Sequence, residues 1–135
     1  MEKYIFELKI KVRDYECDLQ GILNNSVYQN YLEHARHEFL ESRNMSFVEL
    51  HERGIDAVVA RLNMEFKSPL RPGEECVCRL HVKKEGIRYI FHQDIYRLPD
   101  EKISVKAKVE AVILVNGRLG ACEELDALVN LSEEK

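Results

Sequence analysis

The residues best suited to chemistry lie between positions 13 and 28, where acidic side chains, a glycine and two asparagines precede a helical pattern. Asp18 is an acid just upstream of the expected helix start near Asn25. The first turn of a helix offers N–H groups without intrahelical acceptors and a partial positive charge. A carboxylate beside such N–H groups is suited to attack on a carbonyl carbon, because the N–H groups can stabilise the developing oxyanion.

A strand and a long helix are expected to hold this stretch in place. Residues 4–13 alternate between apolar and charged side chains, which predicts a strand with one buried face. Apolar residues then recur at the spacings of three and four that are typical of an amphipathic helix: Val27, Tyr28, Tyr31, Leu32, Ala35 and Phe39. Ser26 with Gln29 forms a candidate capping box, and Asn24 or Asn25 is an alternative cap.

A short helix and four further strands are expected after the long helix. Asn44 is suited to the left-handed turn that ends the long helix. Ser46 and Glu49 form a second capping box, which begins the short helix, and Gly54 is expected to end it. Alternating apolar and polar residues then predict strands over 58–67, 76–83, 89–96 and 103–115. The turns between these strands are short, which implies antiparallel pairing.

The strand over 103–115 has the most regular alternation, with Ser104 and Lys106 expected on the side opposite its apolar residues. Asn116-Gly117 is a strong turn signal after this strand. Apolar residues from Leu125 onward indicate a short C-terminal helix.

Five long strands and one substantial helix predict an α+β fold, in which a curved five-stranded antiparallel sheet wraps around the helix. A chain of 135 residues fits one domain, expected to cover residues 1–135. The edges of such a sheet need cover, so we expect a homo-oligomer, either a homodimer or a homotetramer.

Composition narrows the classes of function. The net charge of −4 argues against a nucleic-acid-binding protein. The sequence contains no apolar run long enough to span a bilayer and no secretory signal, so a cytoplasmic location is expected. Cys17 is a candidate nucleophile, but a packing thiol is the favoured interpretation because no histidine lies near it in sequence.

Three segments carry a resemblance to a known family. Residues 18–23 read as Asp-x-x-Gly-apolar-apolar, and residues 28–36 read as Tyr-x-x-aromatic-apolar-Glu-x-Ala-Arg. Residues 66–74 contain an aromatic-x-x-Pro segment followed by Gly-Glu, where the family has Gly-Asp. In this order, over nearly the whole chain, they resemble hotdog-fold acyl-CoA thioesterases of the 4-hydroxybenzoyl-CoA thioesterase class and their Tol–Pal-associated relatives.

The resemblance implies hydrolysis of an acyl-CoA to a free acid and a thiol, with an acyl carrier protein thioester as the alternative substrate. Asp18 takes the place of the catalytic carboxylate, as nucleophile or general base. The backbone N–H of Asn25 takes the place of the oxyanion donor. Glu33 matches a glutamate that orients or activates a water, acting from a neighbouring subunit. Its alternative role is an exposed pair with Arg36 or His37.

The expected substrate-binding residues extend beyond this loop. Gly21 is a candidate for substrate binding, and the acyl group is expected near Tyr28, Tyr31 and Tyr15, for which core or interface packing is the alternative. The candidates for binding the phosphates of coenzyme A are Arg71, Lys83, Lys84 and Arg88, for each of which plain surface charge is the alternative. No metal and no organic cofactor beyond the coenzyme A of the substrate is expected. Asp14 and Glu16 are interpreted as solvated loop residues.

Two other functions remain open on the same fold. A non-catalytic module could bind acyl-CoA or an acyl carrier protein, because a fold does not fix a function. A hotdog dehydratase would need a histidine base near the helix start, and the sequence has none there. The intact Asp18 favours the thioesterase.

Overall fold

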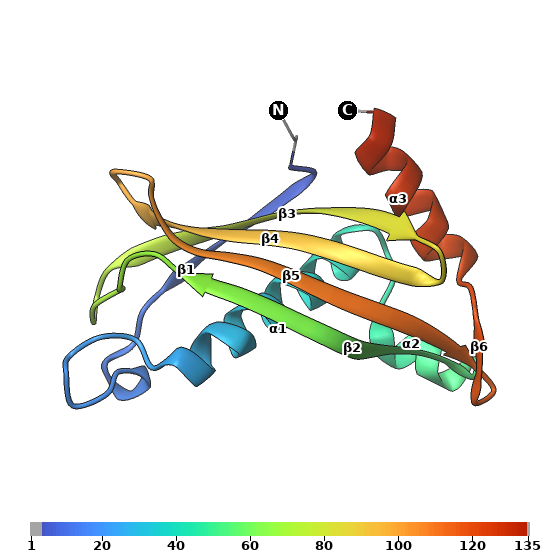
Figure 1. Ribbon diagram of the computed structural model, residues 1–135, viewed down its shortest axis with the longest axis horizontal. Helices are drawn as coiled ribbons and strands as arrows, with labels where there is room; N and C mark the ends of the chain where they lie inside the picture. Colours follow the sequence, from blue (N-terminus) through green and yellow to red (C-terminus); the bar gives the residue numbers. More distant parts are fainter. Residues whose placement is uncertain (1–3, 135) are drawn as a thin grey trace.

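The computed structural model describes residues 4–134, which form an antiparallel sheet with the strand order β1-β3-β4-β5-β2, and β6 paired to β5. The strands are β1 (Phe6–Lys11), β2 (Ile55–Phe66), β3 (Glu75–Glu85), β4 (Arg88–Leu98), β5 (Lys102–Val115) and β6 (Arg118–Gly120). Figure 1 shows the sheet curving over the long helix α1 (Asn25–Ser42). This arrangement confirms the predicted α+β architecture and adds β6, a strand too short to show a periodic pattern.

The core lies between the concave face of the sheet and α1. Six residues of α1 are buried, and they recur at helical spacing: Tyr28, Tyr31, Leu32, Ala35, Phe39 and Leu40. The inward side chains of the sheet, including Cys76 and Cys78, pack against them in the same cluster. Burial of this apolar stripe is the main force that holds α1 under the sheet.

The long helix begins at the alternative cap, and the predicted capping box of Ser26 with Gln29 was wrong because Ser26 already lies inside the helix. Asn24 is the cap of α1, and its Oδ1 accepts a hydrogen bond from the Ser26 N–H at 2.9 Å. Asn44, just past the end of α1, has φ +60°. The short helix α2 (Phe47–Glu52) begins after Ser46, whose hydroxyl accepts from the Glu49 N–H at 3.0 Å.

The C-terminal helix α3 (Glu123–Glu134) covers part of the sheet edge and is longer than the short helix expected. Its residues Leu125, Leu128 and Val129 join the core cluster. Beyond Phe6, where β1 begins, the Val82 N–H of β3 donates to Ser132 Oγ at 3.1 Å. The helix therefore satisfies a backbone N–H of β3 that β1 is too short to pair.

Two strands differ from the expected pattern, each at a register shift. Ser104 was expected to face away from the core, but it is buried. In the β4–β5 pairing, Ile95 lies opposite Val105 and Tyr96 opposite Ile103, so Ser104 of β5 is an extra residue without a partner in β4. The β2–β5 pairing similarly skips Ala60. β2 is an edge strand, and its apolar side chains are largely exposed.

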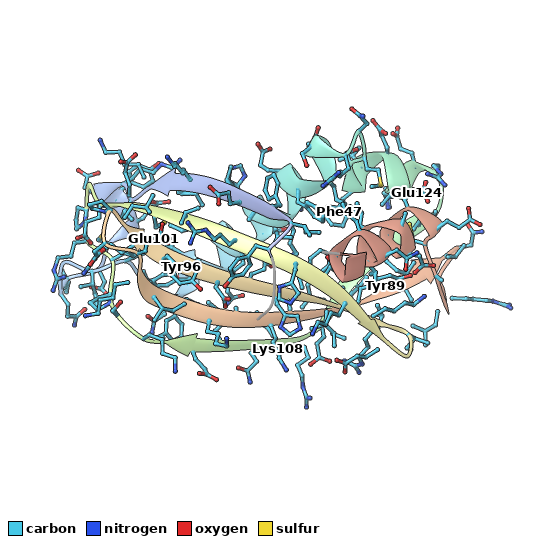
Figure 2. The ribbon with its side chains drawn as sticks, turned by 90° about the horizontal axis from the view of Figure 1, so that it is seen from above. Phe47, Tyr89, Tyr96, Glu101, Lys108 and Glu124 are labelled. Carbon is cyan, nitrogen blue, oxygen red and sulfur yellow. The ribbon has the colours of Figure 1, made fainter. Side chains whose placement is uncertain are left out.

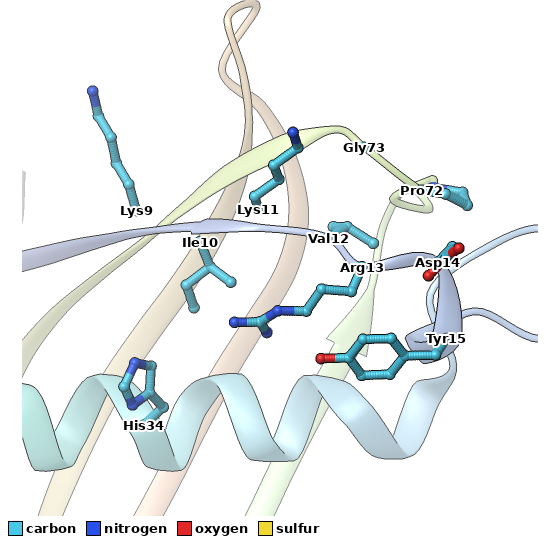
Figure 3. Close-up of a pocket in the computed structure, with 10 residues that line it drawn as sticks. All are labelled: Lys9, Ile10, Lys11, Val12, Arg13, Asp14, Tyr15, His34, Pro72 and Gly73. Carbon is cyan, nitrogen blue, oxygen red and sulfur yellow. The ribbon is translucent and has the colours of Figure 1, made fainter.

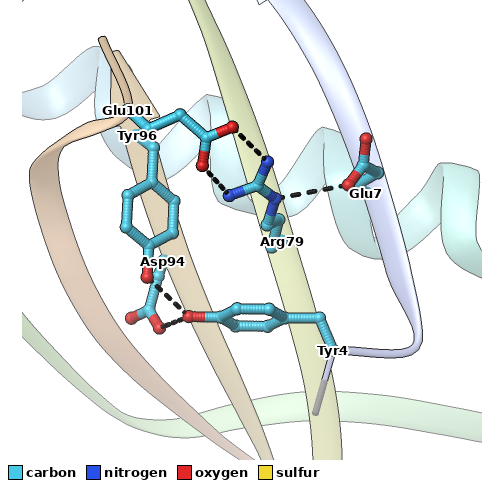
Figure 4. Close-up of polar contacts among 6 residues, drawn as sticks. All are labelled: Tyr4, Glu7, Arg79, Asp94, Tyr96 and Glu101. Carbon is cyan, nitrogen blue, oxygen red and sulfur yellow. Dashed lines mark hydrogen bonds and ion pairs between the residues drawn. The ribbon is translucent and has the colours of Figure 1, made fainter. Parts of the chain in front are cut away.

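Polar side chains join three strands on the convex face of the sheet. The Tyr4 hydroxyl donates to Asp94 at 2.5 Å and lies 2.7 Å from the Tyr96 hydroxyl. Arg79 bridges Glu7 and Glu101, as Figure 4 shows. In Figure 2, Tyr96 and Glu101 lie at the end of the sheet opposite Tyr89, which contacts α3. The contacts of Tyr4 and Arg79 lie on the convex face, whereas α1 and the site lie on the concave face.

Within residues 4–134, no helix combines the length and the apolar composition that crossing a bilayer requires.

Candidate active site

Asp18 lies in a tight loop whose two arms are hydrogen-bonded to each other. Cys17 and Leu23 form an antiparallel bridge, and the Asp18 N–H donates to the Ile22 carbonyl at 2.9 Å. The Gly21 N–H donates to the Asp18 carbonyl at 3.0 Å. Gly21 has φ +74°, a left-handed conformation that favours glycine. The glycine of the Asp-x-x-Gly segment is therefore required by the turn that presents Asp18.

The side chain of Asp18 takes part in the same turn. Its Oδ1 accepts a hydrogen bond from the Gln20 N–H at 2.9 Å. This contact is typical of an aspartate that begins a turn. A carboxylate has about four lone-pair sites, so the contact orients the group and leaves acceptor capacity free. Asp18 thus combines a turn-forming role with a carboxylate held in a fixed direction.

Glu16 is not the solvated loop residue that the sequence indicated, and its side chain is only 12% exposed. The Tyr31 hydroxyl donates to Glu16 Oε1 at 2.7 Å, and the Arg13 N–H donates to the same oxygen at 2.9 Å. Arg13 Nη1 lies 3.1 Å from Oε2. The prediction was wrong because Tyr31, fifteen positions later, reaches back from α1 to the loop.

The loop ends directly at the start of α1. Leu23 N–H donates to the Leu70 carbonyl at 2.7 Å, which ties the loop to the segment between β2 and β3. Asn24 is the cap, so Asn25 is the first helical residue. At that position a backbone N–H has no intrahelical acceptor and lies at the positive end of the helix dipole.

A cavity of about 230 Å³ opens beside this helix start. Its lining comes from the loop, the first turn of α1, the end of β2 and the residues that follow it: Ile22, Leu23, Asn25, Tyr28, Phe66, Lys67, Ser68 and Pro69. The fold thus brings together the helix motif and the aromatic-x-x-Pro segment, which are far apart in sequence. The mostly apolar lining suits an acyl group.

Tyr28 forms one wall of this cavity. Its ring meets Phe66 edge to face, with centroids 5.5 Å apart, and its hydroxyl lies 3.1 Å from Ser104 Oγ. Burial raises the pKa of Tyr28, so its hydroxyl stays neutral. Ser104 was not predicted near the site, because nothing in the alternating pattern marks the skipped position in β5.

Glu33 lies in a different pocket of the same chain. Eight residues after Asn25, it lies about 12 Å further along α1. Its Oε2 lies 3.7 Å from His37 Nε2, and both residues line a pocket of about 170 Å³ with Arg36. The exposed pair of Glu33 with His37, which was the alternative interpretation of Glu33, is therefore present. The structure does not bring Glu33 and Asp18 together within one chain.

The four candidates for binding phosphate occupy two distant places. Arg71 follows Leu70 in the segment that contacts the loop. Lys83, Lys84 and Arg88 lie at the β3–β4 hairpin, and Lys83 and Lys84 are eight and nine residues beyond the start of β3, or about 26–30 Å. Figure 1 shows this hairpin at the end of the sheet opposite the start of α1. Lys84 also pairs with Asp126 at 2.9 Å, and Arg88 with Glu110 at 3.2 Å.

A second, larger hollow of about 590 Å³ lies between β1 and α1. Figure 3 shows Lys9 and Lys11 pointing away from α1, whereas Tyr15 and His34 lie on the helix side. Arg13, also in its lining, is engaged by Glu16. This hollow lies on the β1 side of α1, and its lining does not include Asn25 or the aromatic-x-x-Pro segment.

Cys17 is held as a structural thiol. Its Sγ lies 3.8 Å from the Arg13 carbonyl oxygen. Burial, and then the neighbouring carboxylates of Asp18, Glu16 and Asp14, raise the pKa of Cys17. Because the thiolate is the nucleophilic form, this environment favours the packing interpretation.

The loop therefore leads from the oriented Asp18 carboxylate to the first N–H of α1, and its residues Ile22 and Leu23 line the mostly apolar cavity beside that helix start. An N–H at a helix start can accept the negative charge that develops on a carbonyl oxygen, and a carboxylate can attack the carbon or activate a water. This chemistry fits acyl transfer to water.

Comparisons with known proteins agree with this geometry. The family model "Thioesterase superfamily" matches residues 20–104. A chloroplastic acyl-acyl carrier protein thioesterase from Arabidopsis thaliana is 40% identical over 111 residues, which are 82% of this chain and 58% of that protein. A putative esterase from Aquifex aeolicus is 30% identical over 115 residues, 84% of this chain and 88% of that protein. The chain thus spans little more than half the length of the chloroplast relative.

The fold has close counterparts among solved structures. The structure of a 1,4-dihydroxy-2-naphthoyl-CoA thioesterase from Synechocystis superposes with a TM-score of 0.85. The match covers 93% of this chain and 95% of that chain at 13% identity, which shows the hotdog fold. The family match covers more than half of the residues, from Gln20, two residues after Asp18, through β4 and into β5. The chain belongs to the thioesterase superfamily.

Proposed function

We propose that residues 1–135 form one hotdog domain that hydrolyses an acyl thioester to a free acid and a thiol. The observation that carries the proposal is the position of Asp18, in a hydrogen-bonded loop that leads into α1 beside the 230 Å³ cavity. Acyl-CoA is the proposed substrate and an acyl carrier protein thioester the alternative. The names of the relatives support both carriers.

In the proposed reaction the thioester carbonyl lies at the start of α1. The Asn25 N–H, assisted by the helix dipole, stabilises the oxyanion. In the nucleophilic route, an Asp18 oxygen attacks the carbonyl carbon, the C–S bond breaks and a thiolate leaves. Water then hydrolyses the mixed anhydride and regenerates the carboxylate. In the general-base route, Asp18 takes a proton from the water that attacks, and the thiolate leaves in the same way.

The binding roles follow from position. Gly21 supplies the left-handed residue of the turn that presents Asp18, and Tyr28 supplies an apolar wall for the acyl group. Arg71, in the segment that contacts the loop, is the nearest of the proposed phosphate-binding residues. Lys83, Lys84 and Arg88 lie at the far β3–β4 hairpin, too distant to serve the same chain's Asp18, so any role for them requires a neighbouring subunit.

A homodimer or homotetramer is part of this proposal. β2 is an edge strand with exposed apolar side chains at Val58, Val59, Leu62 and Phe66. Pairing of two such edges would cover them. The proposed water-orienting role of Glu33 also requires a second subunit, because Glu33 lies about 12 Å along α1 from Asn25. The cytoplasmic location expected from the sequence stays a prediction.

The test is release of free thiol from a panel of aliphatic and aromatic acyl-CoAs and from acyl carrier protein thioesters. Turnover of one class supports the proposal and identifies the carrier and the preferred acyl group. Tight binding of an acyl-CoA without thiol release would replace the enzyme with the non-catalytic binding module. Thiol release by the Glu33→Gln variant on the same panel tests the proposed water-orienting role of Glu33.

A further inference from the structure

Glu16 contacts both arms of the Asp18 loop and α1 at once. Its carboxylate accepts hydrogen bonds from the Tyr31 hydroxyl at 2.7 Å and the Arg13 N–H at 2.9 Å. Its backbone carbonyl accepts from the Asn24 N–H at 3.1 Å. One residue therefore binds the start of the loop, the end of the loop and the body of the helix.

The partners of Glu16 are themselves firmly held. Tyr31 is only 3% exposed, and it lies six residues after Asn25, about 9 Å along α1. Asn24 is the helix cap, so the bond to its N–H fixes the residue just before Asn25. Any shift of Glu16 would move Asp18, two residues later, relative to the first N–H of α1.

The hydrogen bond between Glu16 and Tyr31 favours an ionised carboxylate and a neutral hydroxyl. Burial alone would raise the pKa of Glu16, but the Tyr31 hydroxyl and the Arg13 donors lower it overall. Burial, and then the hydrogen bond to Glu16, raise the pKa of Tyr31. Near neutral pH the cluster therefore holds an ionised acceptor and a neutral hydroxyl donor, which is a strong charge-assisted hydrogen bond.

We propose that Glu16 is a positioning residue, which holds the Asp18 carboxylate in place relative to the Asn25 N–H through its bonds to Tyr31, Arg13 and Asn24. The inference rests on the proposed thioesterase function and deepens it. Glu16 does not act on the substrate itself, because both of its carboxylate oxygens are engaged by groups of the loop and the helix.

The expected consequence is a change in turnover rather than in substrate binding. A displacement of about 1 Å in a reacting group can cost on the order of 100-fold in rate. The cavity that would hold the acyl group does not include Glu16 in its lining. Removing the positioning contacts should therefore lower kcat and leave KM nearly unchanged.

The experiment compares Glu16→Ala, Glu16→Gln and Tyr31→Phe with the wild type on the best substrate of the thioester panel. We expect kcat to fall about 100-fold in Glu16→Ala, with KM changed less than about threefold. Glu16→Gln keeps an oxygen for Tyr31 and Arg13, so it should recover at least about tenfold of the loss. Tyr31→Phe removes only the hydroxyl, and its effect should nearly vanish in the Glu16→Ala background.

Asp14→Asn is the matched control, because Asp14 is an exposed acid in the single 3-10 turn Asp14–Glu16, which also contains Glu16. Its kcat should equal that of the wild type. Amide hydrogen exchange gives a readout besides activity. In Glu16→Ala and Tyr31→Phe, exchange at Gly21 and Asn24 should accelerate at least about tenfold, whereas the buried middle of α1 keeps its protection.

The outcomes separate the two proposals. An active wild type whose kcat and loop exchange are unchanged in Glu16→Ala and Tyr31→Phe would overturn the positioning role alone. A rise in KM at constant kcat would overturn it as well. A wild type that hydrolyses no thioester would overturn the proposed function, while loop exchange would still show whether Glu16 holds the loop.

Discussion

Arg36 Nη1 donates a 2.9 Å hydrogen bond to Gln93 Oε1, and this contact joins α1 to the middle of the sheet. Gln93 is fully buried on the concave face of β4. Its Nε2 donates to the Leu32 carbonyl at 3.0 Å, so both ends of the amide have partners on α1. A polar residue is thus accommodated in an apolar core because its hydrogen bonds are satisfied.

Replacement of Gln93 by leucine should destabilise the protein, although leucine is the more apolar residue. The Gln93→Leu variant leaves the half-buried Arg36 guanidinium without its acceptor, at a cost of about 1–3 kcal/mol. Urea unfolding should show this loss. The control Gln29→Leu, at an exposed position of the same helix, should change stability by less than about 0.5 kcal/mol. The double variant Arg36→Met/Gln93→Leu should recover part of the loss, and a strictly additive loss would contradict the pairing.

The sequence predicts the strands and the Asp18 turn, but it does not predict the contacts between elements that are distant in the chain. Alternation at period two predicted the strands, because one face of each strand must be buried, and the Asp-x-x-Gly pattern indicated the turn because it demands a left-handed residue. Gln93 stands at an inward position of β4, but no local pattern reveals its partner on α1. The contact between Glu16 and Tyr31 spans fifteen positions and depends on how the loop packs on the helix. Ser104 was misplaced because a register shift leaves no periodic signal.

Substitution of Gly21, compared with substitution of another left-handed glycine, should distinguish an effect on stability from an effect on activity. In Gly21→Ala the methyl group meets no atom within 4 Å, so the penalty comes from the backbone, about 1–2 kcal/mol. Gly86, in the distant β3–β4 hairpin, has φ +60° and equally open surroundings. We expect similar losses of stability in Gly21→Ala and Gly86→Ala, measured by thermal unfolding. Only Gly21→Ala should lose thioesterase activity, and equal activity in both variants would contradict the role of the Asp18 turn.

Glu16 should make stability depend on pH in a definite direction. Because its pKa is lowered in the folded protein, its stabilising effect is present above the ordinary glutamate pKa of about 4.3. The effect is lost as pH falls through the lower folded value. The difference in unfolding free energy between wild type and Glu16→Gln should therefore be constant from pH 7 to about 5 and shrink below about pH 4. In the Tyr31→Phe background the same comparison should show a smaller pH dependence. A difference that grows on acidification would contradict the assignment.

The edge strand β2 should control assembly. Val59 is 47% exposed in the middle of this strand, beside the register shift. A lysine there would place a charge on the edge that two subunits are proposed to share, so Val59→Lys should convert the oligomer to a monomer in analytical ultracentrifugation. Val48, on α2, is 70% exposed and supplies the control Val48→Lys, which should keep the wild-type mass. A monomeric wild type would contradict the proposed oligomer.

The most direct test of the central claim is the kcat of Asp18→Asn relative to wild type on the best acyl thioester. Asparagine keeps an oxygen for the Gln20 N–H, so the turn should survive, which the thermal unfolding midpoint checks. The proposed mechanism predicts that kcat falls by at least about 100-fold, because both routes need the carboxylate. Asp14→Asn should retain full activity as the control. A folded Asp18→Asn variant that turns over like the wild type would contradict the proposed role of Asp18.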